Sequence, residues 1–284
     1  VNPVLSIITN IGLDHCDMLG GTLPEIAFEK AGIIKPKVPV VIGESHVETD
    51  QVFERKVLYT NLPEPVFMGG RTAIMSLLTF ADKVEPRLWD EHDAILNDMD
   101  LQGSYQSKNL RTVLAALEVL GARPDRASLV RDAIVHTAAR TGFRGRWEQV
   151  MNNPRVICDI GHNEHGLKYN FAQLRQMQES GEISRLVIVY GSVADKDVDA
   201  AVSLFPENAV YVFTKAQGKR AMPAEEVRDR YIDVCTSSGK EPAETYCFEN
   251  VSDAVEKAFV LAGGVSETMT DRPLIYIGGS TYVV

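Results

Sequence analysis

Small, polar and charged residues follow the apolar segments in the second half of the chain. Four such groups lie at residues 159–163 (Asp-Ile-Gly-His-Asn), 191–197, 214–215 (Thr-Lys) and 278–280 (Gly-Gly-Ser). In an open α/β sheet, ligands bind beyond the carboxyl ends of the strands. The four groups together therefore predict a ligand site along one edge of a sheet, although turn formation alone would explain any one of them.

The elements that would position these groups alternate regularly from about residue 141 onward. Strands are predicted at residues 156–158, 186–190, 210–213, 246–248 and 274–277, and helices at residues 166–178, 198–204, 224–236 and 251–261. Strands that alternate with helices of this length predict right-handed crossovers and a parallel sheet that is covered on both faces. Because residues 140–142 (Arg-Thr-Gly) break the preceding helix, we place a domain boundary between residues 142 and 143.

The first half of the chain has a less regular pattern. A strand is predicted at residues 4–9, a glycine-bearing loop at 12–21, and a helix that begins at Thr22, where Glu25 completes a capping box. That helix ends near Gly32. The other expected elements are a strand at 38–42, a helix at 49–60, short strands and loops at 61–104, and two helices with inward stripes at Leu110, Val113, Leu114 and Leu117 and at Leu129, Val130, Ala133 and Ile134.

The composition is that of an ordinary globular protein rather than collagen, a disordered chain or a coiled coil. Of the 284 residues, 45% are hydrophobic and 24% are charged. The formal net charge of −10 predicts no binding to nucleic acid or anionic lipid, and no apolar run approaches the roughly 20 residues of a membrane span. The four cysteines are far apart and form no CxxC pair, which predicts reduced thiols in a cytoplasmic protein.

Several common catalytic motifs do not occur in the sequence. It has no GxGxxG fingerprint, no GxxxxGK[ST] phosphate loop and no GxSxG nucleophile elbow, which disfavours a nicotinamide-dependent dehydrogenase and an α/β-hydrolase. His162 and His165 suggest a metal pair, but no third ligand at a diagnostic spacing accompanies them. We therefore interpret them as loop histidines.

One long, ordered set of motifs resembles a known protein family. It consists of ITNIGLDH at residues 8–15, its continuation through residues 19–35, GSYQ at 103–106 with Asn109, FRGRWE at 143–148, DIGHN at 159–163, and Gly191 with DKD at 195–197. The set resembles the folylpolyglutamate synthases and dihydrofolate synthases of the Mur ligase superfamily. The resemblance spans the chain and is least diagnostic at residues 61–102. Cys16 stands where the family often has threonine, and Glu164 where it often has proline.

This resemblance implies an α/β fold in two parts. Residues 1–142 would be the C-terminal part of a Mur-ligase-type central ATP-binding domain, and residues 143–284 a complete Rossmann-like glutamate ligase domain with a mostly parallel sheet. The implied reaction adds L-glutamate to a folate or pteroate. ATP would phosphorylate a carboxylate, and the glutamate amine would attack the acyl phosphate. The implied cofactors are ATP and Mg²⁺, the implied partners are small molecules alone, and the family is usually monomeric.

The resemblance also assigns roles to single residues. His15 and Lys30 would bind a second Mg²⁺, with Lys30 carrying a carbamate whose two oxygens suit a hard cation. These two and Arg146, as a phosphate clamp, are the predicted catalytic residues. ATP contacts are implied for Asn109, Arg146, Asp159 and His162, and glutamate contacts for Lys196 and Ser280.

From the residues alone, simpler roles stay open. They are a solvated helix lysine for Lys30, a capping or packing role for His15, an ion pair with Glu148 for Arg146, a turn for Asp159 and a surface ion pair for Lys196.

Two features of the family are missing from the sequence. They are a phosphate-binding loop and a magnesium-binding glutamate, which family members carry upstream of the strand expected at residues 4–9. Other residues do not easily replace a loop of backbone N–H groups and a lysine. We therefore expect an N-terminally truncated fragment that is inactive alone. A cell-wall amino-acid ligase of the Mur type, or a non-catalytic binding module that lost its phosphate loop, stays open as an alternative.

Overall fold

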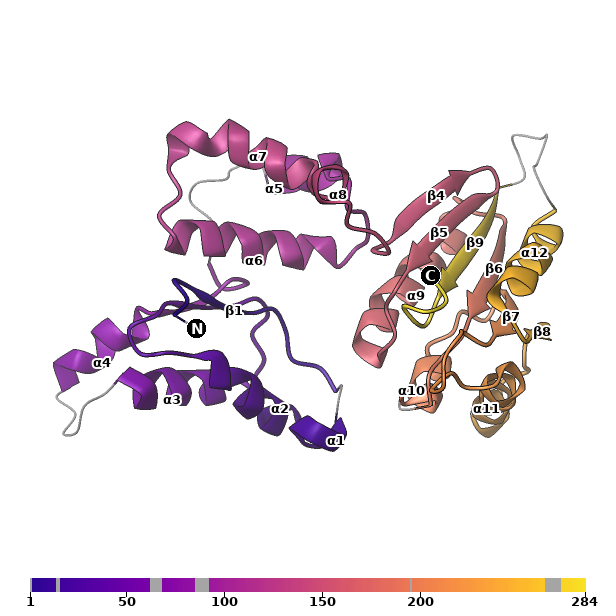
Figure 1. Cartoon of the computed structure of the whole chain (residues 1–284), viewed down its shortest axis with the longest axis horizontal. Coiled ribbons are helices and arrows are strands. Elements are labelled where there is room, and N and C mark those ends of the chain that lie inside the picture. The colour runs from indigo at the N-terminus through magenta and orange to yellow at the C-terminus, as the bar shows by residue number, and fades with distance from the viewer. Residues whose placement is uncertain (1, 14–15, 62–67, 85–91, 195, 264–271) are drawn as a thin grey trace. The chain divides into compact units, whose positions relative to one another are not determined.

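The computed structural model describes residues 2–13, 16–61, 68–84, 92–194, 196–263 and 272–284. The chain divides into two compact units (Figure 1). Unit 1 contains residues 1–100 and 105–140, and unit 2 contains residues 101–104 and 141–284, so a short segment well before the expected boundary also belongs to unit 2. None of the helices in the described ranges combines the length and the apolarity needed to cross a membrane.

Unit 1 is built on a small parallel sheet. Its strands are β1 (Ser6–Ile8), β2 (Val40–Ile42) and β3 (Leu78–Phe80), in the order β1-β2-β3. Its helices are α1 (Cys16–Leu19), α2 (Leu23–Lys30), the 3-10 helix η1 (Ala31–Ile33), α3 (Asp50–Asn61), α4 (Met68–Met75), α5 (His92–Asp98), α6 (Gln106–Val119), the 3-10 helix η2 (Pro124–Arg126), α7 (Ala127–Val135) and α8 (Thr137–Thr141).

Helix α2 begins where its sequence predicts. The Thr22 hydroxyl accepts a hydrogen bond from the Glu25 backbone N–H, and the Glu25 carboxylate accepts one from the Thr22 backbone N–H at 3.1 Å. This capping box satisfies two N–H groups that have no partner within the helix. The helix then buries Ala27 in a cluster with Ile8 of β1 and Phe53 of α3. Helices α2 and α3 therefore cover one face of the sheet, and α6 packs on β2.

Residues 61–104 contain more helix than the sequence indicates. Besides β3, they form α4 and α5, where only short strands and loops are expected. Gly69 and Gly70 lie inside α4, and glycine is a poor helix former, so the pattern conceals the helix. This expectation was wrong because tertiary packing outweighs local preference there; α4 packs along α3.

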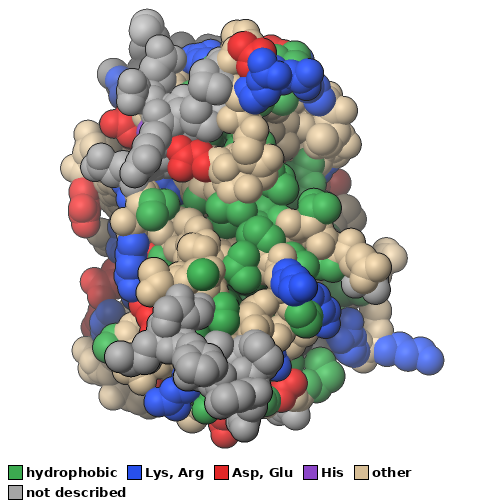
Figure 2. All heavy atoms as spheres, turned by 90° about the vertical axis from the view of Figure 1, so that its left-hand side faces the viewer, with side chains coloured by type: hydrophobic (Ala, Val, Ile, Leu, Met, Phe, Trp, Pro, Cys, Tyr) green, Lys and Arg blue, Asp and Glu red, His purple; other side chains and the backbone are tan. Residues whose placement is uncertain are grey.

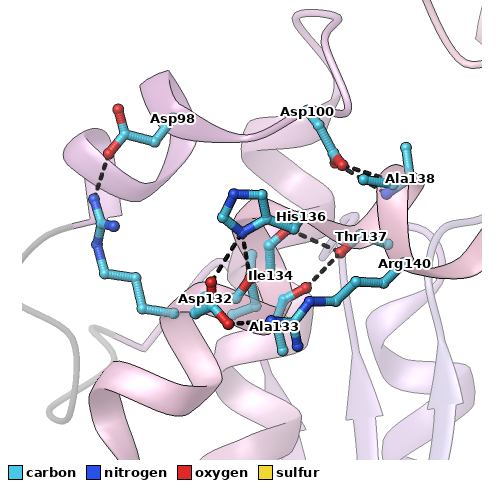
Figure 3. A network of polar contacts seen from close by, with 11 residues as sticks. Asp98, Asp100, Asp132, Ala133, Ile134, His136, Thr137, Ala138 and Arg140 are labelled. Carbon is cyan, nitrogen blue, oxygen red and sulfur yellow. Dashed lines mark hydrogen bonds and ion pairs between the residues drawn. The ribbon is translucent and has the colours of Figure 1, made fainter.

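The helix expected around the stripe from Leu129 to Ile134 is followed by a separate short helix, because the chain breaks between α7 and α8 at His136 (Figure 3). The Asp100 carboxylate, from a segment far away in sequence, accepts hydrogen bonds from the backbone N–H groups of Ala138 at 3.0 Å and Ala139 at 2.8 Å. A carboxylate at a helix N-terminus satisfies orphan donors and complements the helix dipole. Asp132 pairs with His136 and Arg140 across the break. The division is therefore set by long-range contacts.

Unit 1 exposes some side chains that were expected to face inward. Figure 2 shows apolar side chains at the surface of the molecule. Val113 of α6 is 42% exposed and Leu129 of α7 is 61% exposed, which corrects their assignment to inward stripes. Ala133 of α7 is exposed as well, whereas Leu110 and Leu114 of α6 are buried as expected. The two helices also bury Ala115 and Val135.

Unit 2 contains a six-stranded sheet. Its strands are β4 (Glu148–Asn152), β5 (Arg155–Asp159), β6 (Arg185–Tyr190), β7 (Val210–Thr214), β8 (Thr245–Phe248) and β9 (Pro273–Gly278), in the order β4-β5-β9-β6-β7-β8. All neighbours are parallel except β4, which is antiparallel to β5. The expected α/β fold with a mostly parallel sheet is confirmed. The sequence did not predict β4, because its mostly exposed residues form no apolar run.

Helices cover both faces of this sheet. They are α9 (Glu164–Glu179), α10 (Val198–Ser203), α11 (Ala224–Ser237) and α12 (Val251–Leu261). Ile188 and Tyr190 point into the core shared with α9, α10 and α11, whereas Val187 and Val189 lie in the core shared with α12. β9 lies between β5 and β6, so the connection from β8 to β9 crosses the sheet in the direction opposite to the connections before it. Because such connections are right-handed, this reversal places α12 on the other face of the sheet.

Candidate functional site

The carboxyl ends of three central strands of unit 2 align. Asp159 at the end of β5 lies opposite Gly278 of β9, which lies opposite Tyr190 of β6. The loops that follow β6 and β9 are in contact: the Gly191 N–H donates to the Gly278 carbonyl at 3.4 Å. The predicted convergence of the polar groups that follow these strands on one sheet edge is therefore observed, and this edge is the candidate site.

Arg146 lies on the turn that leads into β4. The neighbouring Arg144, not Arg146, forms the ion pair with Glu148, and the Glu148 carboxylate also accepts the Gly145 N–H at 2.8 Å. Arg146 is half-buried and makes no hydrogen bond or ion pair within the ranges that the structure describes. The alternative of an Arg146–Glu148 pair is therefore not realised. A guanidinium in this state has its planar set of donors available for an anion.

Asp159 is buried, with 1% of its surface exposed. Its Oδ2 accepts the Trp147 backbone N–H at 2.8 Å, and its Oδ1 accepts the Gly161 backbone N–H at 2.7 Å and the Asn170 side-chain amide at 2.8 Å. Asp159 was predicted to contact ATP, for which a ribose hydroxyl was the suited partner. Its two carboxylate oxygens accept these three hydrogen bonds from the protein. The contact with ATP stays a prediction.

His162 follows on the same loop and is half-buried. Its Nδ1 lies 3.1 Å from the Ile160 carbonyl oxygen. Because a carbonyl accepts but cannot donate, Nδ1 carries the proton in this hydrogen bond and a neutral ring has its Nε2 available as an acceptor. His165 instead packs edge-to-face against Tyr169, with ring centroids 5.3 Å apart. The described part of the chain holds no group of three His, Cys, Asp or Glu residues arranged for a metal ion.

The predicted glutamate-binding residues lie on the neighbouring loops. Ser280 is buried, and its hydroxyl accepts the Tyr282 backbone N–H at 3.2 Å. Lys196 precedes α10, where the Asp197 carboxylate caps the helix by accepting the Ala200 N–H at 3.0 Å. Asp197, one of the two acidic residues that flank Lys196, therefore serves as a helix cap. The other, at position 195, lies outside the described ranges.

The remaining predicted residues belong to unit 1. Lys30 ends α2, and its Nζ donates to the Asn10 carbonyl oxygen at 3.4 Å, just beyond the end of β1. Asn109 of α6 donates its side-chain amide to Gln106 at 2.9 Å. His15 lies outside the described residues, so the predicted convergence of His15 and Lys30 on one cation stays a prediction. The predicted carbamate on Lys30 likewise stays a prediction.

Sequence reasoning missed buried polar groups at this sheet edge. The hydroxyls of Tyr190, Ser192 and Thr214 are buried and make no hydrogen bond of good geometry within the described ranges, although the Ser192 hydroxyl lies near enough to Tyr190 to lower its pKa slightly. Burial raises the pKa of Tyr190 to about 12, so Tyr190 presents a neutral hydroxyl at neutral pH. Ser192 and Thr214 belong to the predicted strand-end groups, but Tyr190 ends an apolar run that gives no functional signal.

Comparisons with known proteins support the resemblance seen in the sequence. Residues 145–266 match the family described as the Mur ligase, glutamate ligase domain. The dihydrofolate synthase/folylpolyglutamate synthase of Haemophilus influenzae is 31% identical over 210 residues, which cover 70% of this chain and 46% of the relative. That of Bacillus subtilis is 29% identical over 201 residues, covering 69% of this chain and 45% of the relative.

Solved structures share the fold. Escherichia coli FolC in complex with DHPP and ADP matches with a TM-score of 0.70 at 22% identity, covering 100% of this chain and 60% of that one. A bifunctional folylpolyglutamate synthase/dihydrofolate synthase with Mn, AMPPNP and L-glutamate bound matches with a TM-score of 0.71 at 19% identity, covering 100% of this chain and 61% of that one.

The chain is thus a homologue of dihydrofolate and folylpolyglutamate synthases, and residues 145–266 belong to the Mur ligase, glutamate ligase domain family. It spans about half the length of the curated relatives that it matches.

Proposed function

We propose that this chain takes part in the ATP-dependent addition of L-glutamate to a folate or pteroate, through an acyl-phosphate intermediate. The observation that carries the proposal is Arg146, a half-buried guanidinium without a partner among the described residues, on a turn that is hydrogen-bonded to the loop of His162. Both residues lie in the segment that matches the glutamate ligase domain. The relatives' names and the nucleotides in the solved homologues support the assignment.

Arg146 would hold phosphate oxygens of ATP, because a guanidinium binds them through two parallel N–H bonds and neutralises charge that develops as a phosphoryl group moves. His162 has its Nδ1–H held by the Ile160 carbonyl, so its Nε2 would accept from a nucleotide hydroxyl or amine. Asn109 would add a further polar contact to the nucleotide.

Lys196 and Ser280 would bind the glutamate substrate through its carboxylates, since both lie on loops at the carboxyl edge of the unit 2 sheet. His15 and Lys30 would hold a divalent cation, for which Mg²⁺ is the proposed ion and a Lys30 carbamate the proposed ligand. That cation would neutralise phosphate charge when bound. Lys30 contributes its position, with Nζ held near the loop after β1 by the Asn10 carbonyl.

The sequence contains no GxxxxGK[ST] phosphate loop. We therefore propose that these 284 residues alone do not turn ATP over. A Mur-type cell-wall amino-acid ligase is the second candidate, because the matching domain family is named for the Mur ligases.

The experiment is a substrate panel with the protein as its gene encodes it. ADP release is measured with MgATP and L-glutamate in the presence of a reduced folate, a pteroate or a nucleotide-sugar carboxylate. Release that depends on folate or pteroate and on glutamate is the expected result. Release only with the nucleotide sugar would assign the protein to the cell-wall ligases, and no release with any acceptor would refute a ligase. The same assay on the 284 residues should give no turnover.

A further inference from the structure

A groove lies between α2 and α3 of unit 1, and α1 contributes to its wall. The three helices follow one another along the same side of the unit (Figure 1), and α2 packs against both of the others. The groove has a volume of about 740 Å³ and is lined by thirteen residues, all of them in unit 1. The sequence assigned a role in ligand binding to none of these residues.

Apolar side chains from all three helices are exposed in this groove. Met18 of α1 is 76% exposed, Phe28 of α2 is 59% exposed and Tyr59 of α3 is 81% exposed. Other residues of the same helices form the core, since Ala27 and Phe53 are buried against the sheet. Single exposed apolar residues are common on proteins, but three large ones that line one groove indicate a surface that a partner covers.

The charged residues of the groove are divided between its two main walls. Glu25 and Glu29 lie one turn apart on α2, whereas Arg55 and Lys56 lie together on α3. The Glu25 carboxylate is engaged in the cap of its own helix, and Lys56 Nζ lies 5.8 Å from the centroid of the Phe28 ring. The side chains of Glu29 and Arg55 make no ion pair or hydrogen bond with any residue that the structure describes. They are therefore available to a partner.

One further acid lines the groove. Glu48 lies in the loop before α3, and its carboxylate is 3.9 Å from the Nδ1 of its neighbour His46. The main part of the α3 wall is thus basic, whereas the α2 wall is acidic.

Opposite charges on opposite walls make the groove complementary to itself. In a dimer with two-fold symmetry the same patch serves both copies, so each contact between two different residues occurs twice. A two-fold axis along the groove sets α2 of one copy over α3 of the other, so that each Glu29 meets the partner's Arg55. An axis across the groove sets α2 over α2 and brings like charges together, which is unfavourable. The charges therefore select the axis along the groove.

We propose that this groove is the interface of a homodimer, in which α1, α2 and α3 of two copies of the chain pack together. The exposed apolar side chains form its centre, and two pairs of Glu29 and Arg55 fix its orientation. Its lining is smaller than the roughly 20–30 residues per side of a standard interface, so the dimer forms at micromolar rather than nanomolar concentrations. This proposal departs from the monomer that the family resemblance implies, and it does not depend on the proposed function.

The first test is the oligomeric state of the 284-residue chain, measured by sedimentation equilibrium from low to high micromolar concentrations. We expect monomer and dimer in exchange. Phe28→Asp places a charge at the centre of the interface and should leave only monomer. Leu129→Asp is the matched control, because Leu129 is 61% exposed on α7 and does not line the groove, so this variant should dimerise like the unsubstituted chain. A chain that is monomeric throughout the range, or equal behaviour of F28D and L129D, would overturn the proposal.

The second test reverses the charges on the two walls. Glu29→Lys and Arg55→Glu should each raise the dissociation constant of the dimer by about tenfold or more, because each sets two pairs of like charges against one another. Glu256→Lys reverses an exposed glutamate of α12 in unit 2 and should leave the dissociation constant unchanged. If E29K and R55E dimerise as strongly as E256K, the charges do not face one another and the proposal is wrong.

An equimolar mixture of E29K and R55E distinguishes this interface from any other. In a two-fold dimer of one E29K chain with one R55E chain, both charge pairs are attractive again. The mixture should therefore dimerise more strongly than either variant does alone, and the double variant E29K/R55E should recover in the same way. A misfolded variant cannot be rescued by mixing, so recovery also shows that both variants fold. Failure of either the mixture or the double variant to recover would overturn the proposed arrangement.

Discussion

Among the described glycines of the candidate site, Gly279 leaves the least room for a Cβ, and Gly279→Ala tests the packing of the loop after β9 against the core of unit 2. Its φ is +95°, and a Cβ there would lie 2.4 Å from the Tyr190 ring and 2.5 Å from the Gly191 carbonyl oxygen. Gly263 is a matched control, because its φ is +86° but no atom of the described residues lies within 4 Å of its Cβ position. The left-handed backbone costs an alanine about 1–2 kcal/mol at either site, and overpacking adds about 1–3 kcal/mol at Gly279 alone.

We therefore expect Gly279→Ala to lower the free energy of unfolding by about 1–3 kcal/mol more than Gly263→Ala does. A difference of 2 kcal/mol corresponds to a Tm lower by roughly 4–8 °C for a unit of this size. The assay is thermal unfolding of both variants, followed by the emission of Trp147 in unit 2 in a Trp89→Phe background that has no other tryptophan. Equal losses in the two variants would show that the loop after β9 does not pack against Tyr190 as described, and would refute the convergence of the strand-end loops.

Three further predictions concern two helix caps and a half-buried thiol. Thr22→Ala should lower the free energy of unfolding by about 1 kcal/mol in urea, because the Glu25 N–H loses its acceptor; no change would contradict the capping box. Asp100→Ala should speed amide hydrogen exchange at Ala138 and Ala139, the two groups it caps, whereas Asp125→Ala should not; equal exchange in both variants would remove the reason given for the separate α8. Burial, with a smaller contribution from Glu148, raises the pKa of Cys158 from 9.0 to about 11. Alkylation of Cys158 should therefore become half-maximal near pH 11, and the stability of the fold should decrease as pH rises from 9 to 11, because the folded state disfavours the thiolate; a labelling midpoint near pH 9 would contradict this.

The sheet of unit 2 was predictable because its parallel strands are buried on both faces. Such strands are continuous apolar runs, and the runs at β6 and β9 stand out from the amphipathic helices between them. β4 was missed for the opposite reason, since it is an exposed edge strand without an apolar face. α4 was missed because its two glycines oppose helix formation, and the break before α8 because Asp100 lies far away in sequence.

The location of the candidate site was predictable from the sequence, but the hydrogen bonds and ion pairs within it were not. Strand-end residues mark the edge of the sheet, because parallel strands all end there. Which arginine pairs with Glu148 depends on the backbone of the turn at Gly145, and the sequence FRGRWE offers both Arg144 and Arg146 as partners. The left-handed backbone of Trp147, whose ring packs against Tyr276, and the hydrogen bond from Asn170 to Asp159 involve contacts that no local pattern encodes.

The central claim is that Arg146 is a nucleotide-binding cation of a glutamate ligase domain. Its most direct test is the affinity of this chain for ADP with Mg²⁺, compared with Arg146→Ala and with Arg144→Ala. The neighbouring Arg144 carries the same charge but is engaged by Glu148. The account predicts that the unsubstituted chain binds ADP, that R146A loses about tenfold or more in affinity, and that R144A stays close to the unsubstituted chain. Equal affinities for all three proteins, or an equal loss in both variants, would contradict it.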